Sequence, residues 1–185
     1  MRRVMITLAL VSGLGVSPAA AQLQEVRQTI FGMDLAVCAH AVRVAVRKLD
    51  GVRSVTVSLN DGYADILLAS QNTVTVERIR EAIRRNGFSP REALVRVSGT
   101  VVRQGEQLVL EVAGSGTTFL LAGAPEALER LARATGGSPV TLDGSVPESQ
   151  RGSRTPLVFH LAGGPGRRLL EERAGPTAQR LLRWR

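Results

Sequence analysis

Hydrophobic and polar positions along residues 24–93 follow two periods, which predict a mixture of strands and helices. Where apolar residues recur at every second position, as at Val55, Val57 and Leu59, one face of a strand is expected to be buried. Where they recur at three- and four-residue spacing, an amphipathic helix is expected. The predicted order is strand 25–31, helix 35–49, strand 52–59, strand 63–68, a helix capped by Thr73 or Thr75 and ended by Gly87, and strand 88–93.

Turn signals support this order and indicate how the strands connect. Asn60-Asp61-Gly62 is typical of a hairpin turn between the second and third strands. Pro90 lacks a backbone N–H, so the last strand is expected to lie at an edge of the sheet. A strand-helix-strand-strand-helix-strand order is the ferredoxin-like α+β arrangement. We therefore expect residues 22–93 to form one ferredoxin-like domain.

Residues 94–162 predict a second unit that is rich in strands. Three strand patterns come first, a helix follows with Pro125 in its first turn and Gly136-Gly137 at its end, and two strand patterns complete the unit. The five predicted strands cover residues 95–101, 107–112, 117–121, 140–146 and 157–161. Three strands, a helix and two strands is the order of an OB-fold barrel. We expect a small OB-like β-barrel with one helix.

The N-terminus has the features of a secretory signal peptide. Arg2 and Arg3 precede a short apolar run, and residues 17–21 are mostly small. The apolar run is too short to span a bilayer, so no transmembrane anchor is expected. Residues 1–21 are therefore a predicted signal peptide, and the mature protein is expected to be periplasmic or secreted.

The distribution of charge argues against nucleic-acid binding. The formal net charge is +8. Residues 94–162 are neutral, however, and the last 23 residues, 163–185, carry six Arg and two Glu. Nucleic-acid binding requires a clustered basic patch, and single-strand binders add stacking aromatics, whereas aromatic residues make up only 3% of this chain. Residues 163–185 are expected to be a basic, disordered tail, with contact to an anionic membrane surface or an acidic partner as the alternative.

Candidate chemistry centres on Cys38, the only cysteine of the chain. It lies where the first predicted strand gives way to the first helix, close to His40, and the other histidine is His160 in the last predicted strand. An exported protein with one cysteine cannot form an internal disulfide, so Cys38 is a metal ligand, an intermolecular bridge or an inert thiol. So few nucleophiles and bases form no catalytic constellation, and we expect no enzyme activity.

Several short motifs around this helix resemble the heavy-metal-associated domain family. They are Gly32-Met33 before the helix, Leu49-Asp50-Gly51-Val52 after it, the strand motif Val55-Thr56-Val57-Ser58-Leu59, and Gly87-Phe88. The family includes soluble copper chaperones, mercury-binding periplasmic proteins and the N-termini of metal-pumping P-type ATPases. The resemblance implies soft-metal binding through a Gly-Met-x-Cys-x-x-Cys loop. Cys38 matches the second cysteine of this loop, whereas Leu35 stands at the first.

The missing first cysteine leaves the ligand set incomplete. One thiolate cannot hold a soft cation tightly by itself. His40 would lie about 200° around the helix from Cys38, and the resemblance implies that Met33 packs into the core. The preferred hypothesis is an exported protein that binds Cu(I) or Hg(II) through Cys38, weakly or with a ligand shared with a second chain, for exchange with a partner. The alternatives are a metal-independent envelope interaction module and a thiol-linked dimer.

Overall fold

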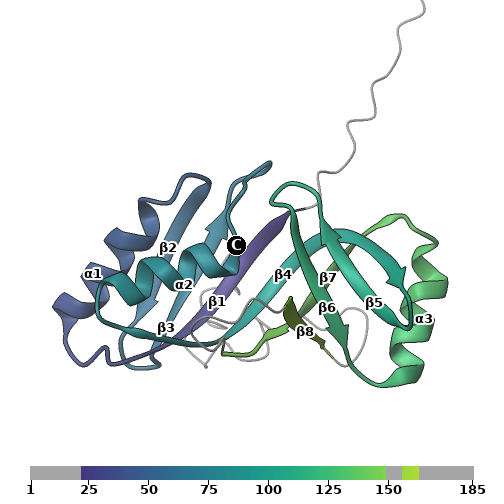
Figure 1. The fold of residues 1–185 in the computed structure, drawn as a ribbon. Coiled ribbons are helices and arrows are strands. Elements are labelled where there is room, and N and C mark those ends of the chain that lie inside the picture. Colours follow the sequence, from purple (N-terminus) through teal and green to yellow (C-terminus); the bar gives the residue numbers. More distant parts are fainter. Residues whose placement is uncertain (1–21, 149–155, 163–185) are drawn as a thin grey trace, which may run out of the picture.

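The computed structural model describes residues 22–148 and 156–162, so the predicted signal peptide, residues 1–21, and the basic tail, residues 163–185, lie outside the described residues. No helix in the described ranges is long and apolar enough to cross a membrane. Figure 1 shows the elements in chain order: β1 (Leu23–Phe31), α1 (Ala36–Arg47), β2 (Val52–Ser58), β3 (Tyr63–Leu68), α2 (Val76–Arg85), β4 (Ser89–Gln104), β5 (Gln107–Val112), β6 (Thr117–Ala122), α3 (Pro125–Thr135), β7 (Pro139–Val146) and β8 (Leu157–Leu161).

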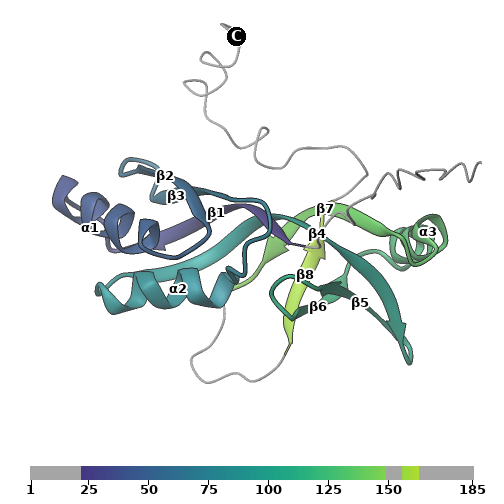
Figure 2. The same ribbon diagram turned by 90° about the horizontal axis from the view of Figure 1, so that it is seen from above.

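The first half is the predicted ferredoxin-like α+β fold. Its strands pair antiparallel in the order β2-β3-β1-β4, and α1 and α2 lie side by side on one face (Figure 2). Inward residues of strands and helices form one aliphatic core, in which Val26, Ile66 and Val42 are all fully buried. The hairpin turn ends at Gly62, whose φ of +67° is the left-handed conformation that glycine adopts without strain.

Helix α2 begins and ends at the expected signals. Of the two candidate caps, Thr75 is the one used, because its hydroxyl oxygen accepts the N–H of Arg78 at 3.2 Å. The apolar residues Val76, Ile79 and Ile83, which share one face of the helix, are each fully buried. The same face of α2 also buries Arg80, which the hydrophobic pattern alone did not indicate.

Strand β4 corrects the predicted pair of short strands and their place in the sheet. Residues 88–93 and 95–101 were expected as separate strands, but they form one strand that pairs with β1 and, further along, with β7 and β5. The expected edge position holds for the residues around Pro90, which pair with β1 alone, but not from Ala93 onwards, where β7 pairs on the other side. Pro90 is tolerated because it pairs only with Ile30 of β1, next to a register shift, and pairing with β7 begins at Ala93. The boundary expected between residues 93 and 94 falls inside this strand.

The second half of the sheet closes on itself through β4. The eight-stranded mixed sheet continues β4-β5-β6-β8-β7, and β7 pairs back with β4 to complete a ring of strands. The β6–β8 pair is parallel and the other pairs of the ring are antiparallel. Inside the ring, Phe119 and Phe159 are buried and pack edge to face with ring centroids 5.8 Å apart. Leu128 and Leu131 of α3 pack against the same core.

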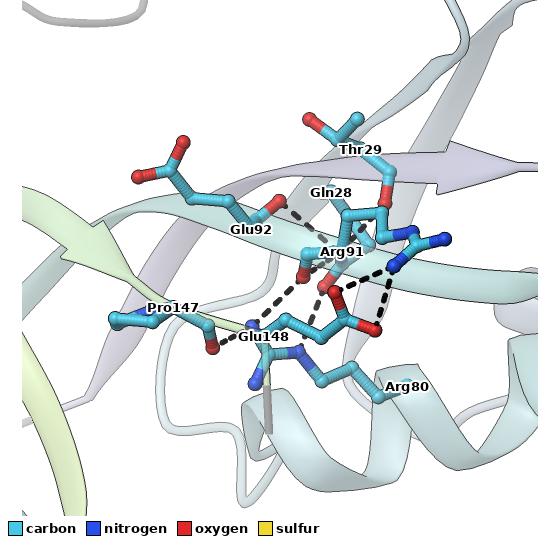
Figure 3. A network of polar contacts seen from close by, with 7 residues as sticks. All are labelled: Gln28, Thr29, Arg80, Arg91, Glu92, Pro147 and Glu148. Atoms are coloured by element: carbon cyan, nitrogen blue, oxygen red, sulfur yellow. Dashed lines mark hydrogen bonds and ion pairs between the residues drawn. The ribbon is translucent and has the colours of Figure 1, made fainter. Parts of the chain in front are cut away.

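Arg80 joins the two halves. Figure 3 shows its guanidinium, which is fully buried, between α2, β4 and the end of β7. Nε donates a hydrogen bond to Gln28 Oε1 at 3.3 Å. Nη2 donates to three carbonyl oxygens, those of Arg91 at 3.1 Å, Val146 at 2.9 Å and Pro147 at 2.8 Å. One side chain of the ferredoxin-like half therefore holds backbone that belongs to the ring.

The buried guanidinium is held mainly by these carbonyl groups. Burial is the main cause that lowers the pKa of Arg80, and Glu77 and Glu148 oppose the shift only through longer-range attraction. Its Nη1 atom is buried and has no hydrogen-bond partner in the described part of the chain. Because a buried charge must be compensated, the three carbonyl oxygens on Nη2 are the contacts that make this position tolerable.

A second polar cluster gives the fold a measurable pH dependence. Arg96 of β4 donates to both carboxylate oxygens of Asp143, at 2.8 and 3.1 Å, and to Glu25 of β1 at 3.4 Å. Burial raises the pKa of Glu25, and the attraction of Arg96 only partly offsets it. A carboxyl whose pKa is higher in the folded protein costs stability once it ionises, so this cost grows as pH rises through its folded pKa.

Glu25→Gln is therefore expected to be at least as stable as wild type at pH 7, with a gain of less than about 1 kcal/mol. The gain should disappear at pH values low enough to protonate Glu25 in both states. Urea unfolding between pH 3 and 7 measures this difference. Glu129→Gln is the control of opposite sign, because Arg103 lowers the pKa of Glu129 and its ionisation favours the folded state. A Glu25→Gln protein whose deficit grows toward neutral pH would contradict the assignment.

Candidate metal centre

The loop between β1 and α1 is anchored to the core by Met33. It begins at Gly32, whose φ of +93° is the left-handed conformation that favours glycine. Met33 follows and is 6% exposed, so its side chain lies in the core, as the family resemblance implied. With Met33 in the core, the next residues, Asp34 and Leu35, reach the surface, and α1 begins at Ala36.

Cys38 lies in the first turn of α1. Its backbone N–H donates to the Leu35 carbonyl oxygen at 2.9 Å, and its thiol is free and half-buried, with one side packed against the core. Leu35 is the N-cap residue in an extended conformation, and its side chain is 63% exposed and caps no N–H. The two positions of the Cys-x-x-Cys motif thus stand one turn apart at the helix start, and only Cys38 carries sulfur.

The histidines do not complete the ligand set. His40 is exposed, and its Nδ1 accepts a hydrogen bond from Arg43 Nη2 at 3.0 Å. Since α1 is already helical at Cys38, His40 lies about 200° further around the axis. His160 is exposed on β8, next to the buried Phe159, because neighbouring side chains of a strand point to opposite faces. Within residues 22–148 and 156–162, no group of three or more His, Cys, Asp or Glu side chains is placed to hold a metal ion.

Three exposed apolar side chains lie in or next to the loop that leads from β1 to Cys38, and we call them the loop patch. Phe31 is 66%, Leu35 63% and Val37 67% exposed, and the guanidinium carbon of Arg91 lies 5.3 Å from the centre of the Phe31 ring. Figures 1 and 2 both place this loop at the end of the ferredoxin-like half that is remote from β5, β6 and α3. The loop patch was not among the features expected from the sequence.

A signal for the loop patch is nevertheless present in the sequence. Along β1, inward residues are Val26, Gln28 and Ile30, so alternation puts Phe31 on the opposite face. On α1 the buried positions are Val42 and Val46, and Val37 lies off that stripe. Large exposed apolar residues that gather beside a thiol indicate a surface for contact with another molecule.

Comparisons with known proteins place the same segment in one family. The family model of the heavy-metal-associated domain matches residues 28–89, and a search of curated proteins found no match. Among solved structures, a copper-binding domain from HMA7, a P-type ATPase, is 30% identical and covers 36% of this chain and 89% of its own, with a TM-score of 0.35.

Two further solved structures match the same part of the chain. The CopZ metallochaperone is 27% identical and covers 36% of this chain and 97% of its own, with a TM-score of 0.34. Oxidised MerP from Ralstonia metallidurans CH34 is 24% identical and covers 37% of this chain and 93% of its own, with a TM-score of 0.34. Through residues 28–89, which run from β1 to the start of β4, the chain belongs to the heavy-metal-associated domain family.

Proposed function

We propose that this chain is an exported protein that binds a soft heavy-metal ion, Cu(I) or Hg(II), through Cys38 and exchanges it with a partner. The observation that carries the proposal is the place of Cys38: a free, half-buried thiol in the first turn of α1, at the second cysteine position of the family loop. The match to the heavy-metal-associated domain, and relatives that bear the names of a copper-binding domain and a metallochaperone, support soft-metal binding.

The second ligand comes from outside the chain. A thiolate is the ligand type that Cu(I) and Hg(II) prefer, and two such ligands suffice for a near-linear site. Leu35 supplies none, so a thiol of a partner protein or of a second copy completes the site. The loop patch supports this arrangement, because Phe31, Leu35 and Val37 give the incoming protein an apolar surface that excludes water from the ion.

Export and the second half of the chain complete the proposal. Residues 1–21 carry the features of a signal peptide, which agrees with a periplasmic or secreted location, where soft metals arrive unbuffered by cytosolic thiols. The ring of β4 to β8 has the strand order and the parallel β6–β8 pair that suit an OB-like barrel, which we assign as a docking module rather than a nucleic-acid binder. We assign the protein no catalytic role.

Titration with Cu(I) under anaerobic conditions tests this function. Wild type is expected to bind Cu(I) weakly, Cys38→Ser to lose binding, and Leu35→Cys to bind at least about 100-fold more tightly, because a second thiolate in the same loop replaces an intermolecular ligand. Leu35 is exposed, so the new cysteine requires no repacking. Leu67→Cys, at another exposed apolar position, is the matched control and is expected to leave the affinity unchanged.

A metal-independent interaction module is the second candidate, and the exposed Leu35 at the first ligand position favours it. In that case wild type and Cys38→Ser would bind Cu(I) equally poorly. Addition of Cu(I) would then leave the midpoint of thermal unfolding unchanged in each of the two proteins. That result would overturn the metal-binding proposal, provided that both proteins show the same circular dichroism spectrum.

A further inference from the structure

The outer sides of α1 and α2 enclose a groove that neither the metal loop nor the sheet uses. It has a volume of about 420 Å³ and lies where the two helices contact each other. Small side chains keep it open: its apolar floor is formed by Ala41, Val44, Ala45, Leu49 and Ala82. Val44 is 38% exposed, which is high for an apolar residue of an amphipathic helix. We call this hollow the helix groove; α1 and α2 are seen side by side in Figure 2.

The rim of the helix groove is basic. It is formed by His40, Lys48, Arg85 and Asn86, and Arg43 donates to the His40 ring beside it. Glu81 pairs with Arg85 at 2.9 Å and with Arg84 at 3.4 Å and neutralises part of this charge. Residues 36–48 nevertheless hold three basic and no acidic residues, and α2 holds three basic residues besides the buried Arg80 and two acidic ones. The face around the groove is therefore positive.

The charge distribution restricts what can occupy the helix groove. The chain's own tail, residues 163–185, carries six Arg and two Glu and would be repelled. A second copy would present the same basic rim, so two groove faces would also repel each other. A flat anionic lipid surface would meet the charges but leave the apolar floor unfilled. A segment with carboxylates and a protruding aliphatic side chain satisfies both the rim and the floor.

We propose that the helix groove is a docking site for an acidic peptide segment of a partner protein. An aliphatic side chain of the segment lies on Val44 and Ala82, and flanking carboxylates pair with Lys48 and Arg85. Docking there needs neither a metal ion nor Cys38. It therefore goes beyond the proposed metal binding, and an experiment can disprove one without disproving the other.

Selection from a phage-displayed library of random twelve-residue peptides, with the purified chain as bait, tests the proposal. The enriched peptides are expected to carry net negative charge and at least one Leu, Ile or Val. The best peptide, made synthetically with a fluorophore, is then titrated with protein variants. Val44→Lys, which fills the floor without removing positive charge, and the double variant Lys48→Glu/Arg85→Glu are each expected to weaken binding at least 10-fold.

Two controls distinguish binding in the helix groove from binding elsewhere on the chain. Arg78→Glu reverses one charge, as each half of the double variant does, on an exposed part of α2 outside the groove and is expected to weaken binding less than about 2-fold. Cys38→Ser is expected to bind the peptide as wild type does, whatever its metal affinity. Enrichment of neutral or basic peptides would overturn the proposal, and so would an Arg78→Glu effect as large as that of the double variant. The proposal would also be wrong if the chain sedimented with phosphatidylglycerol vesicles and Val44→Lys changed neither this sedimentation nor peptide binding.

Discussion

Replacing Arg80 by alanine is expected to lower the free energy of unfolding by about 3 kcal/mol or more. The substitution removes the donor to the carbonyl oxygens of Val146 and Pro147, and the Arg91 oxygen keeps the hydrogen bond from Gln28 Nε2. The Val146 contact is buried, so this oxygen loses its donor without gaining water. It also leaves a void between α2 and β4, because the Arg80 side chain is fully buried. Urea unfolding followed by circular dichroism measures the loss.

Variants at the same helix separate the causes of this loss. Arg84→Ala removes a more exposed guanidinium that pairs with Glu81 at 3.4 Å, and is expected to cost less than about 1 kcal/mol. Arg80→Met fills much of the void but supplies no donors, so it should remain well below wild type. If Arg80→Met restored wild-type stability, the carbonyl contacts would contribute little and the assigned role of Arg80 would be wrong. Hydrogen exchange should show lost protection at the end of β7 as well as in α2.

Replacing Gly144 by alanine is expected to cost about 3 kcal/mol, because the ring has no space for a methyl group there. A Cβ at this position would lie 2.4 Å from two carbons of the buried Phe159 ring and 2.5 Å from the backbone carbonyl oxygen of His160. The Phe159 side chain is packed against Phe119, and the carbonyl belongs to β8, which pairs with β7 at this point. Neither neighbour can move without loss of packing or of the strand pair.

The matched control is Gly123→Ala at the end of β6. A Cβ there would meet only Leu161 side-chain carbons at 3.6 and 3.7 Å, which is ordinary contact distance. Thermal unfolding is expected to place Gly123→Ala within about 0.5 kcal/mol of wild type, since it changes an exposed position. Equal stability of Gly144→Ala and Gly123→Ala would contradict the packing described for the ring.

Elements whose hydrophobic period is regular could be predicted from the sequence. The bounds of β3 and β5 match the expected ranges, and those of β2 and α1 differ by one or two residues at an end. In β3 the buried residues Ala64, Ile66 and Leu68 alternate with less buried ones, so burial of one face sets the period that the sequence shows. The motif match to the heavy-metal-associated domain was likewise available from the sequence, because the glycines and aliphatic residues that define the family stand at the expected spacing.

Features that depend on contact between distant segments could not be predicted. The unbroken β4 needs β1, β7 and β5 as partners, and Pro90 indicated only that its own segment lies at an edge. Arg80 occupies an apolar position of α2, between Ile79 and Ile83, and Gln28 occupies an inward position of β1. Two polar residues on inward faces were a signal of a buried network. Their partners lie far along the chain, however: Gln28 donates to backbone of β4, and Arg80 donates to Val146 of β7, 66 residues further along.

The candidate site also has a part that could be predicted from the sequence and a part that was not. The position of Cys38 in the first turn of α1 and the failure of His40 to converge on it follow from helical geometry. The loop patch was not predicted, although alternation along β1 and the helical period of α1 place Phe31 and Val37 off the buried faces. The resulting candidate site is a single thiol at the second ligand position of the family loop, next to exposed apolar side chains.

X-ray absorption at the copper edge of the Cu(I)-loaded wild-type protein is the sharpest test of metal binding by Cys38. We expect two sulfur ligands at each copper ion, both supplied as Cys38 thiolates when no other thiol is present, and therefore two protein chains per ion. Copper coordinated by nitrogen or oxygen alone, with a spectrum that Cys38→Ser leaves unchanged, would contradict this binding mode.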